Sequence, residues 1–221
     1  MTPAVSIVLL WIGFAGSHML LSHVPIRDRL VARLGAKPFQ GLYSLVALGF
    51  FVPLVRIYFR HVHEGPALWT LPHGPVLTWI VQIGMGVAFV LLVAGFAKPS
   101  PASMVPGPAT VRGALRITRH PVIMSMGLFG VLHLLVNGTT TDVAFFAGFP
   151  IFAVAGCWHQ DRRKLAKQQP GYAEFVAATP FLPFTGGNVA QAVREIGLVP
   201  FAAGIALAAI VRWGHGLWGG A

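Results

Sequence analysis

The sequence predicts an all-α, polytopic membrane protein with about six transmembrane helices and both termini in the periplasm. Of its 221 residues, 55% are hydrophobic and only 10% are charged, and the mean hydropathy is +0.71. Soluble domains contain about 25% charged residues, so this chain has too few polar side chains to cover a water-soluble surface. These values exclude a cytosolic enzyme and a disordered protein. The single cysteine, Cys157, also excludes a disulfide scaffold.

Six segments approach the roughly 20 apolar residues that cross a bilayer core. They are residues 4–24, 39–59, 76–97, 121–137, 142–158 and 197–213. We expect the first segment to be a permanent helix, because no basic residue precedes it as in a cleaved signal peptide. Only four residues separate the fourth and fifth segments, which predicts an antiparallel hairpin. No repeat is visible, so residues 1–221 are expected to form one membrane domain.

The distribution of basic residues predicts the orientation. Thirteen of the 16 Lys and Arg residues lie in three places: between the first and second segments, between the third and fourth, and after the fifth. The positive-inside rule places these loops in the cytoplasm and both termini outside. The same rule accounts for the net charge of +10 without nucleic acid as a partner. We therefore expect a protein of the bacterial inner membrane, with the lipid bilayer as its main partner.

Two polar stretches are expected to follow the membrane surface. Residues 111–119 place three arginines at helical spacing against apolar residues, which predicts a short interfacial helix. Residues 159–195 form the longest polar segment but retain several aromatic residues, so they are expected to fold back onto the membrane.

The histidines are the main candidates for chemistry, because ionisable groups inside membrane spans are rare and usually functional. At 1.5 Å per residue, His18 and His133 are expected about 13 and 18 Å from the cytoplasmic boundary. They are therefore each other's best partners. His23, His120 and His159 are expected near the boundary itself. The remaining histidines are expected to be solvated: His61, His63, His73 and His215.

Two neutral imidazoles on separate helices at similar depth suit the axial ligation of a haem. Cations at the boundary would pair with its propionates, and four arginines are available there: Arg27, Arg112, Arg116 and Arg119. The alternative is that each buried histidine simply bonds to a helix carbonyl or to Ser17. A c-type haem is excluded because the chain has no C-x-x-C-H motif. No P-loop, dinucleotide fingerprint or Ser-His-Asp set is present.

Several motifs together resemble the NnrU-like membrane family. They are GSHMLLSHVPIRDRLVARLG (16–35), KPFQGLYSLVALG (37–49), RGALRITRHPVIMSMGLFGVLHLLVNG (112–138), CWHQDRRKL (157–165) and FLPF (181–184). Bacterial members of this family are linked to nitrite and nitric oxide reduction (denitrification). Its plant branch consists of the 15-cis-ζ-carotene isomerases, membrane enzymes whose haem b is held by histidines.

The resemblance implies haem b between the first and fourth spans, with His18 and His133 as ligands and His120 as the alternate for the second. Arg119, Arg116 and Arg27 would serve the rim. The implied function is denitrification or the cis–trans isomerisation of a polyene such as 15-cis-ζ-carotene. A polyene substrate and respiratory or carotenoid-pathway membrane proteins would then be its partners.

Two other functions stay open. A non-catalytic assembly factor for a respiratory reductase fits the bacterial branch. The motif Arg119-His120-Pro121 also resembles the isoprenylcysteine carboxyl methyltransferases, which bind S-adenosylmethionine. Their acidic pair is replaced here by Gln160-Asp161-Arg162, which weakens that resemblance.

Overall fold

The computed structural model describes residues 1–72, 74–103 and 107–215, and His73 lies outside these residues. The described residues form helices without any named strand; one isolated bridge joins Ala67 and Thr139. The helices are α1 (Pro3–Ser22), α2 (Val24–Leu34), α3 (Ala36–Arg60), α4 (Pro75–Ala97), the 3-10 turn η1 (Gly113–Arg116), α5 (Pro121–Val136), α6 (Thr140–Phe146), α7 (Gly148–Ala166), α8 (Tyr172–Ala178), α9 (Val189–Ile196) and α10 (Leu198–His215).

The helices confirm the predicted membrane protein. Among the described residues, five stretches are long and apolar enough to cross a bilayer: α1, α3, α4, α10 and the continuous stretch Thr140–Ala166. Helix α5 is apolar but shorter, at 16 residues. The fifth predicted span is longer than expected, because α7 continues to Ala166 through a polar final part.

A proline explains why this fifth stretch divides into α6 and α7. Pro150 has no N–H to donate, and its ring clashes with the carbonyl four residues earlier, that of Phe146. Helix α6 therefore ends at Phe146, and α7 begins at Gly148 after a single intervening residue, Ala147.

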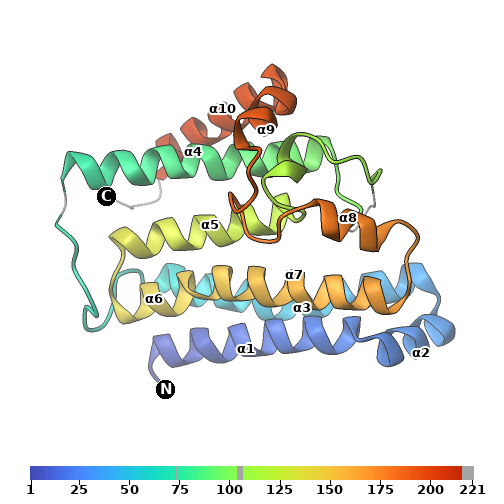
Figure 1. The fold of residues 1–221 in the computed structure, drawn as a ribbon. Helices are drawn as coiled ribbons and strands as arrows, with labels where there is room; N and C mark the ends of the chain where they lie inside the picture. Colours follow the sequence, from blue (N-terminus) through green and yellow to red (C-terminus); the bar gives the residue numbers. More distant parts are fainter. Residues whose placement is uncertain (73, 104–106, 216–221) are drawn as a thin grey trace.

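The crossing helices run side by side, with α5 and α7 in the middle of the bundle (Figure 1). Helix α7 packs against α5 and α1, and α1 packs against α3. On the other side, α5 packs against α4, which in turn packs against α10. Helix α10 ends at the same end of the bundle at which α1 begins (Figure 1).

Glycines allow two of these helix pairs to approach closely. A Cβ atom on Gly204 of α10 would lie 2.6 Å from the Cα of Val90 in α4. A Cβ atom on Gly148 of α7 would overlap the indole of Trp11 in α1. The Trp11 indole N–H also donates a 3.0 Å hydrogen bond to the carbonyl of Phe145. Small residues at such crossings are how membrane helices gain packing contacts.

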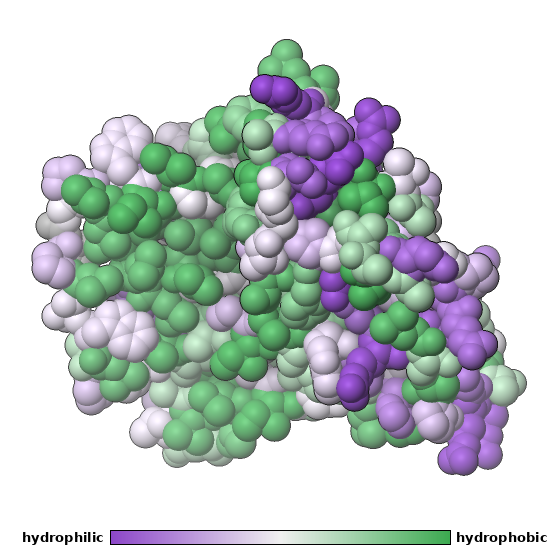
Figure 2. Space-filling model, in the orientation of Figure 1, coloured by the Kyte–Doolittle hydropathy of each residue, from purple (hydrophilic) through white to green (hydrophobic). Residues whose placement is uncertain are grey.

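Hydrophilic residues gather at one end of the bundle, over α2, η1, α8 and α9, which we call the basic end (Figure 2). The interfacial helix expected at residues 111–119 is reduced there to η1. Gly113 has a φ of +56°, which a side chain would disfavour, and Ala114 and Leu115 are buried. Because η1 packs against α9 and α4, it belongs to the protein interior and not to the lipid interface.

A buried carboxylate lies at the opposite end of the bundle. Asp142 in the first turn of α6 is fully buried and accepts hydrogen bonds from Tyr58 Oη (3.0 Å), His63 Nδ1 (2.9 Å) and Thr139 Oγ1 (2.7 Å). His63 is half exposed, as expected for a solvated histidine, and it also bonds to this buried carboxylate. Asp142 joins α3, the loop that follows it and α6 into one unit.

Candidate functional site

Two histidines face each other at the basic end. The rings of His23 and His159 have centroids 6.4 Å apart and planes inclined by 31°. His23 lies at the break between α1 and α2, in an extended conformation. Its carbonyl accepts hydrogen bonds from the N–H groups of Ile26 and Arg27. Pro25 starts α2 there, since a first-turn proline has no N–H to satisfy.

The facing ring, His159 on α7, carries an unsatisfied polar atom. Its Nε2 is buried and has no hydrogen-bond partner among the described residues. An unpaired buried nitrogen costs about 1–3 kcal/mol, so an ion or ligand that bonds to this atom would stabilise the protein. A metal–imidazole bond measures about 2 Å, so two imidazoles on opposite sides of one metal ion place their ring centres about 6 Å apart. The spacing of His23 and His159 fits that arrangement.

Each of these histidines is followed by an arginine four residues later. Arg27 follows His23 on α2, and Arg163 follows His159 on α7. Residues at this spacing lie on the same face of a helix. Both arginines are partly buried, and the guanidinium of Arg27 lies 5.6 Å from the centre of the Phe39 ring. Two cations beside two neutral imidazoles suit a cofactor with a metal ion and two carboxylates, such as haem b.

An exposed ion pair between α2 and the end of α7 lies next to this site. Lys167 Nζ, just after α7, donates to Asp28 Oδ1 of α2 at 2.6 Å. This contact joins the two segments that follow the histidines. Surface pairs of this kind contribute little to stability, so its role is to fix the position of α2.

The structure does not bring His18 and His133 together. His18 packs among Phe14, Tyr43 and Phe152, whereas His133 stacks on Phe146, with ring centroids 4.5 Å apart. Phe152 and Phe146 are six residues apart along the α6–α7 stretch, which corresponds to about 9 Å.

The helix ends place these two histidines at different distances from the basic end. Helix α5 has only 16 residues, so His133 lies near its far end, while His18 lies one turn from the basic end of α1. The neighbouring histidine of His133 is His215, with ring centroids 6.3 Å apart.

The helix-carbonyl bonds expected under the alternative are present at both histidines, and each leaves the other ring nitrogen, Nε2, available to a metal. Each Nδ1 bonds to the carbonyl four residues earlier, Phe14 for His18 and Phe129 for His133. Aromatic side chains occupy the region between them, including the buried Trp11 and Phe149. A flat ring held by both histidines does not fit this packed interior.

Arg119 and His120 belong to an internal network centred on Asp161. The Asp161 carboxylate accepts from Arg119 Nε (2.7 Å), His120 Nε2 (2.8 Å) and the Tyr172 hydroxyl (2.5 Å). Arg119 also donates to the carbonyl of Thr179 at 2.9 Å. Burial and the hydrogen bond to Asp161 raise the pKa of Tyr172 above its usual range. The network joins the start of α5 to α7 and α8, and Pro121 begins α5 as predicted.

This network changes two expectations. His120 is only 4% exposed and is bonded to Asp161, so it does not point toward His18. The guanidinium of Arg119 is likewise held inside the protein rather than at a ligand rim. The same internal bonding argues against S-adenosylmethionine binding by the Arg-His-Pro motif.

Arg116 also has a structural partner. Its Nε and Nη2 donate to the two carboxylate oxygens of Glu195 on α9, at 2.8 and 3.1 Å. The Gly113 N–H adds a third bond to the same carboxylate. These bonds, that from Arg116 first, lower the pKa of Glu195 to about 2. Of the arginines proposed for the site, Arg27 alone lies beside the facing histidines of the described chain.

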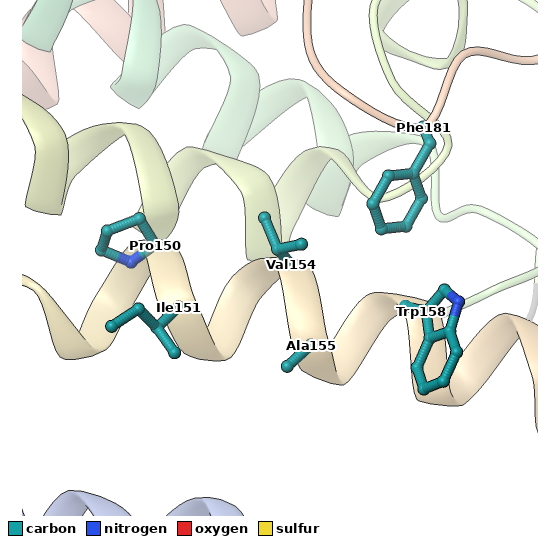
Figure 3. Close-up of a pocket in the computed structure, with 6 residues that line it drawn as sticks. All are labelled: Pro150, Ile151, Val154, Ala155, Trp158 and Phe181. Carbon is teal, nitrogen blue, oxygen red and sulfur yellow. The ribbon is translucent and has the colours of Figure 1, made fainter.

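An apolar groove lies on the exposed side of α7, close to His159. Its volume is about 580 Å³. Its lining residues are Pro150, Ile151, Val154, Ala155, Trp158 and Phe181. Five of them follow one side of α7, and the Phe181 ring, from the segment after α8, projects toward that helix (Figure 3). Apart from the indole N–H of Trp158, these lining side chains are apolar.

Comparison with known proteins supplies the family. The profile described as "NnrU protein" matches residues 6–221. The chain belongs to the NnrU protein family. No solved structure matches this NnrU family member.

Two curated relatives have the same name, 15-cis-zeta-carotene isomerase, chloroplastic. The protein from Arabidopsis thaliana is 24% identical over 229 residues, which cover 100% of this chain and 62% of the relative. The protein from Zea mays is 23% identical over 183 residues, covering 81% of this chain and 50% of the relative. This NnrU family member therefore spans between half and two thirds of the length of these relatives.

Sequence reasoning places His23 and His159 near the boundary but does not pair them. Their signal is a repeated spacing: each precedes an arginine by four residues at the basic end of a predicted span. In the sequence, Asp161 is noticed only because it lies where the methyltransferases have their acidic pair. Because the chain has six acidic residues, an acid next to a membrane span is itself a signal of a buried partner.

Proposed function

We propose that this NnrU-family chain is a haem b-binding protein of the bacterial inner membrane that isomerises a cis double bond in a polyene such as 15-cis-ζ-carotene. The main support is the facing pair His23 and His159, whose spacing suits two axial ligands and whose second member has an unpaired, buried Nε2. The names of the two curated relatives supply the reaction and the substrate class.

Each residue of the site has a distinct role in this proposal. His23 and His159 would hold the iron, and Arg27 and Arg163 would pair with the two propionates. When bound, the haem supplies a redox-active metal centre that lowers the double-bond character of the cis bond. The apolar side chains of α1 and α7 exclude water from the reacting chain, and Lys167–Asp28 keeps α2 against α7. Isomerisation itself moves no atom to or from the substrate.

A role in nitrite or nitric oxide reduction is the second function that we consider. The observation that favours it is that His23 is exposed at the basic end. A redox partner in the cytoplasm could therefore exchange electrons with the same centre. A test in intact cells separates the two functions: deletion of the gene would slow anaerobic growth on nitrite in one case and cause accumulation of the cis polyene in the other.

Absorption spectroscopy of the purified protein tests the haem site. We expect a Soret band typical of six-coordinate low-spin haem in protein from haem-replete cells. The variants His23→Ala and His159→Ala should each lose this band or convert it to a five-coordinate form. The matched variants His18→Ala and His133→Ala, which also remove a membrane histidine, should retain it.

Two results would contradict the proposal. A colourless wild-type protein would contradict haem binding. Loss of the band in His18→Ala and His133→Ala, with retention in the other two variants, would move the ligands back to the pair expected from the sequence. The reaction is tested separately, by incubating the reduced protein with 15-cis-ζ-carotene and separating the isomers by chromatography.

A further inference from the structure

The apolar groove on α7 has no role in holding the haem, yet it lies on the same helix as His159. We propose that this groove binds the hydrocarbon chain of a linear polyene, which enters sideways from the bilayer. This inference rests on the proposed function, because it names the place where the substrate of that reaction lies. It adds a binding surface made by α7 and Phe181.

The shape of the groove follows from the sizes of its side chains. Ala155 is small and lies between the larger Ile151 and Trp158 along α7, so the helix surface is hollow at this point. The Phe181 ring forms the wall across from α7 (Figure 3). From Pro150 to Trp158 the groove extends over eight residues, which is about 12 Å of helix. This length accommodates the middle of an extended polyene, with both ends of the chain left in the lipid.

The chemistry of the lining matches a hydrocarbon better than a lipid headgroup. Apart from the indole N–H of Trp158, the lining side chains are apolar, so the groove offers little to the several acceptor oxygens of a phosphate or an ester. Its end near the basic end is formed by two aromatic rings, Trp158 and Phe181. Flat aromatic surfaces pack well against a flat conjugated chain. The guanidinium of Arg162 lies 4.6 Å from the centre of the Trp158 ring.

The position of the groove favours a reacting molecule over a passive acyl chain. Ala155 precedes His159 by four residues, so the two lie on adjacent turns of the same side of α7. A chain that fills the hollow at Ala155 therefore lies next to the proposed metal ligands.

The wall of the groove is also held in place. Phe181 packs edge-on against His120, with ring centroids 5.8 Å apart, and lies 5.0 Å from the guanidinium of Arg119. Because both of these residues belong to the Asp161 network, the wall is part of the rigid interior. A preformed wall of this kind suits a defined ligand better than mobile lipid.

Filling the groove with a larger side chain tests the proposal. Ala155→Leu and Val154→Phe each place extra carbon atoms in the hollow, and both face the lipid, so folding should be unaffected. Ala206→Leu is the matched control, since Ala206 is exposed on α10, away from the groove. Each protein is incubated with phosphatidylcholine vesicles that contain 15-cis-ζ-carotene and is then re-isolated. The carotene retained per protein and the Soret band are measured in the same sample.

We expect Ala155→Leu and Val154→Phe to retain about tenfold less carotene than the wild type, as overpacking a fitted site predicts. The Soret band should be unchanged, and Ala206→Leu should behave as the wild type. Equal carotene retention by all four proteins would contradict polyene binding in the groove. This binding would also be contradicted if a phospholipid with a photoreactive acyl chain labelled residues 150–158 equally with and without carotene.

The same samples distinguish this inference from the proposed function. If carotene retention depends on Ala155 but the protein lacks haem or does not isomerise the carotene, the groove is supported and the proposed reaction is contradicted. If Ala155→Leu has a normal Soret band and normal turnover, the proposed reaction is supported and the groove is contradicted.

Discussion

The imidazole of His120 and the carboxylate of Asp161 are joined by a 2.8 Å hydrogen bond although they are 41 residues apart in the chain. This bond ties the start of α5 to the polar end of α7, two residues beyond His159. Arg119 and Tyr172 bond to the same carboxylate, so two other segments, the start of α5 and α8, hold this turn of α7. The backbone near His159 is therefore held by residues that are distant in the chain.

We expect Asp161→Asn to lower the free energy of unfolding by about 3 kcal/mol, because it leaves the buried Arg119 without its charged partner. Asp28→Asn is the control. It breaks the exposed pair with Lys167 and should cost less than about 1 kcal/mol. Denaturant unfolding in mixed micelles measures both. Similar losses for the two variants would contradict the structural role of the Asp161 network.

At the opposite end of the bundle, Asp142→Asn should destabilise the protein by about 2–3 kcal/mol. The amide retains one acceptor for the three donors Tyr58, His63 and Thr139, and buried polar groups without partners are costly. Glu64→Gln is the matched control, because Glu64 is exposed and pairs only with His61 by its side chain. The haem spectrum should be the same in both variants, since this cluster is remote from His23 and His159. A change in the spectrum of Asp142→Asn would show that the two ends are coupled.

Acid should release α9 from η1 only at very low pH. The hydrogen bond from Arg116 lowers the pKa of Glu195 to about 2 in the folded protein, against about 4.3 for an unperturbed glutamate. A lowered pKa means that this contribution to stability is complete above the unfolded value and is lost as the pH falls toward 2. Hydrogen exchange of residues 113–118 and 189–196, corrected for the intrinsic rate, should therefore rise between pH 4 and pH 2. Glu195→Gln should exchange fast at every pH, and a wild-type transition near pH 6 would refute the assignment.

The basic end is expected to face the cytoplasm, which places the start of α1 and the end of α10 in the periplasm. Alkaline phosphatase fused to the C-terminus should be active, and a green fluorescent protein fused there should be dark. The same reporters inserted between α2 and α3 should give the opposite result. If instead the C-terminal fusion to green fluorescent protein were bright and the alkaline phosphatase inserted between α2 and α3 were active, the topology would be the opposite of the predicted one.

The sequence was sufficient to predict the membrane helices, because a bilayer imposes both their length and their apolar composition. Five of the six predicted spans have boundaries within three residues of those in the structure. The fifth span was predicted too short, since α7 continues beyond the apolar stretch with residues that bond to other parts of the protein. Helix α2 was not predicted, because its 11 residues are too few and too polar for a span.

The site was harder to predict than the fold because side-chain partners depend on distant segments. Depth estimates paired His18 with His133, but they could not show that α5 is short or that aromatic rings occupy the space between the two. Arg116, Arg119 and His120 were assigned to a ligand because their acidic partners, Glu195 and Asp161, lie 79, 42 and 41 residues away. Conversely, His23 and His159 gained importance only when one ring was found facing the other.

The two facing histidines also determine when the site can form during biosynthesis. His23 lies 136 residues before His159 in the chain, so it leaves the ribosome much earlier. Most of the chain must therefore be synthesised and inserted before both rings are present. Under the proposed function, haem can then be held by both histidines only after α7 has been made. Chains halted before α7 carry His23 without its partner.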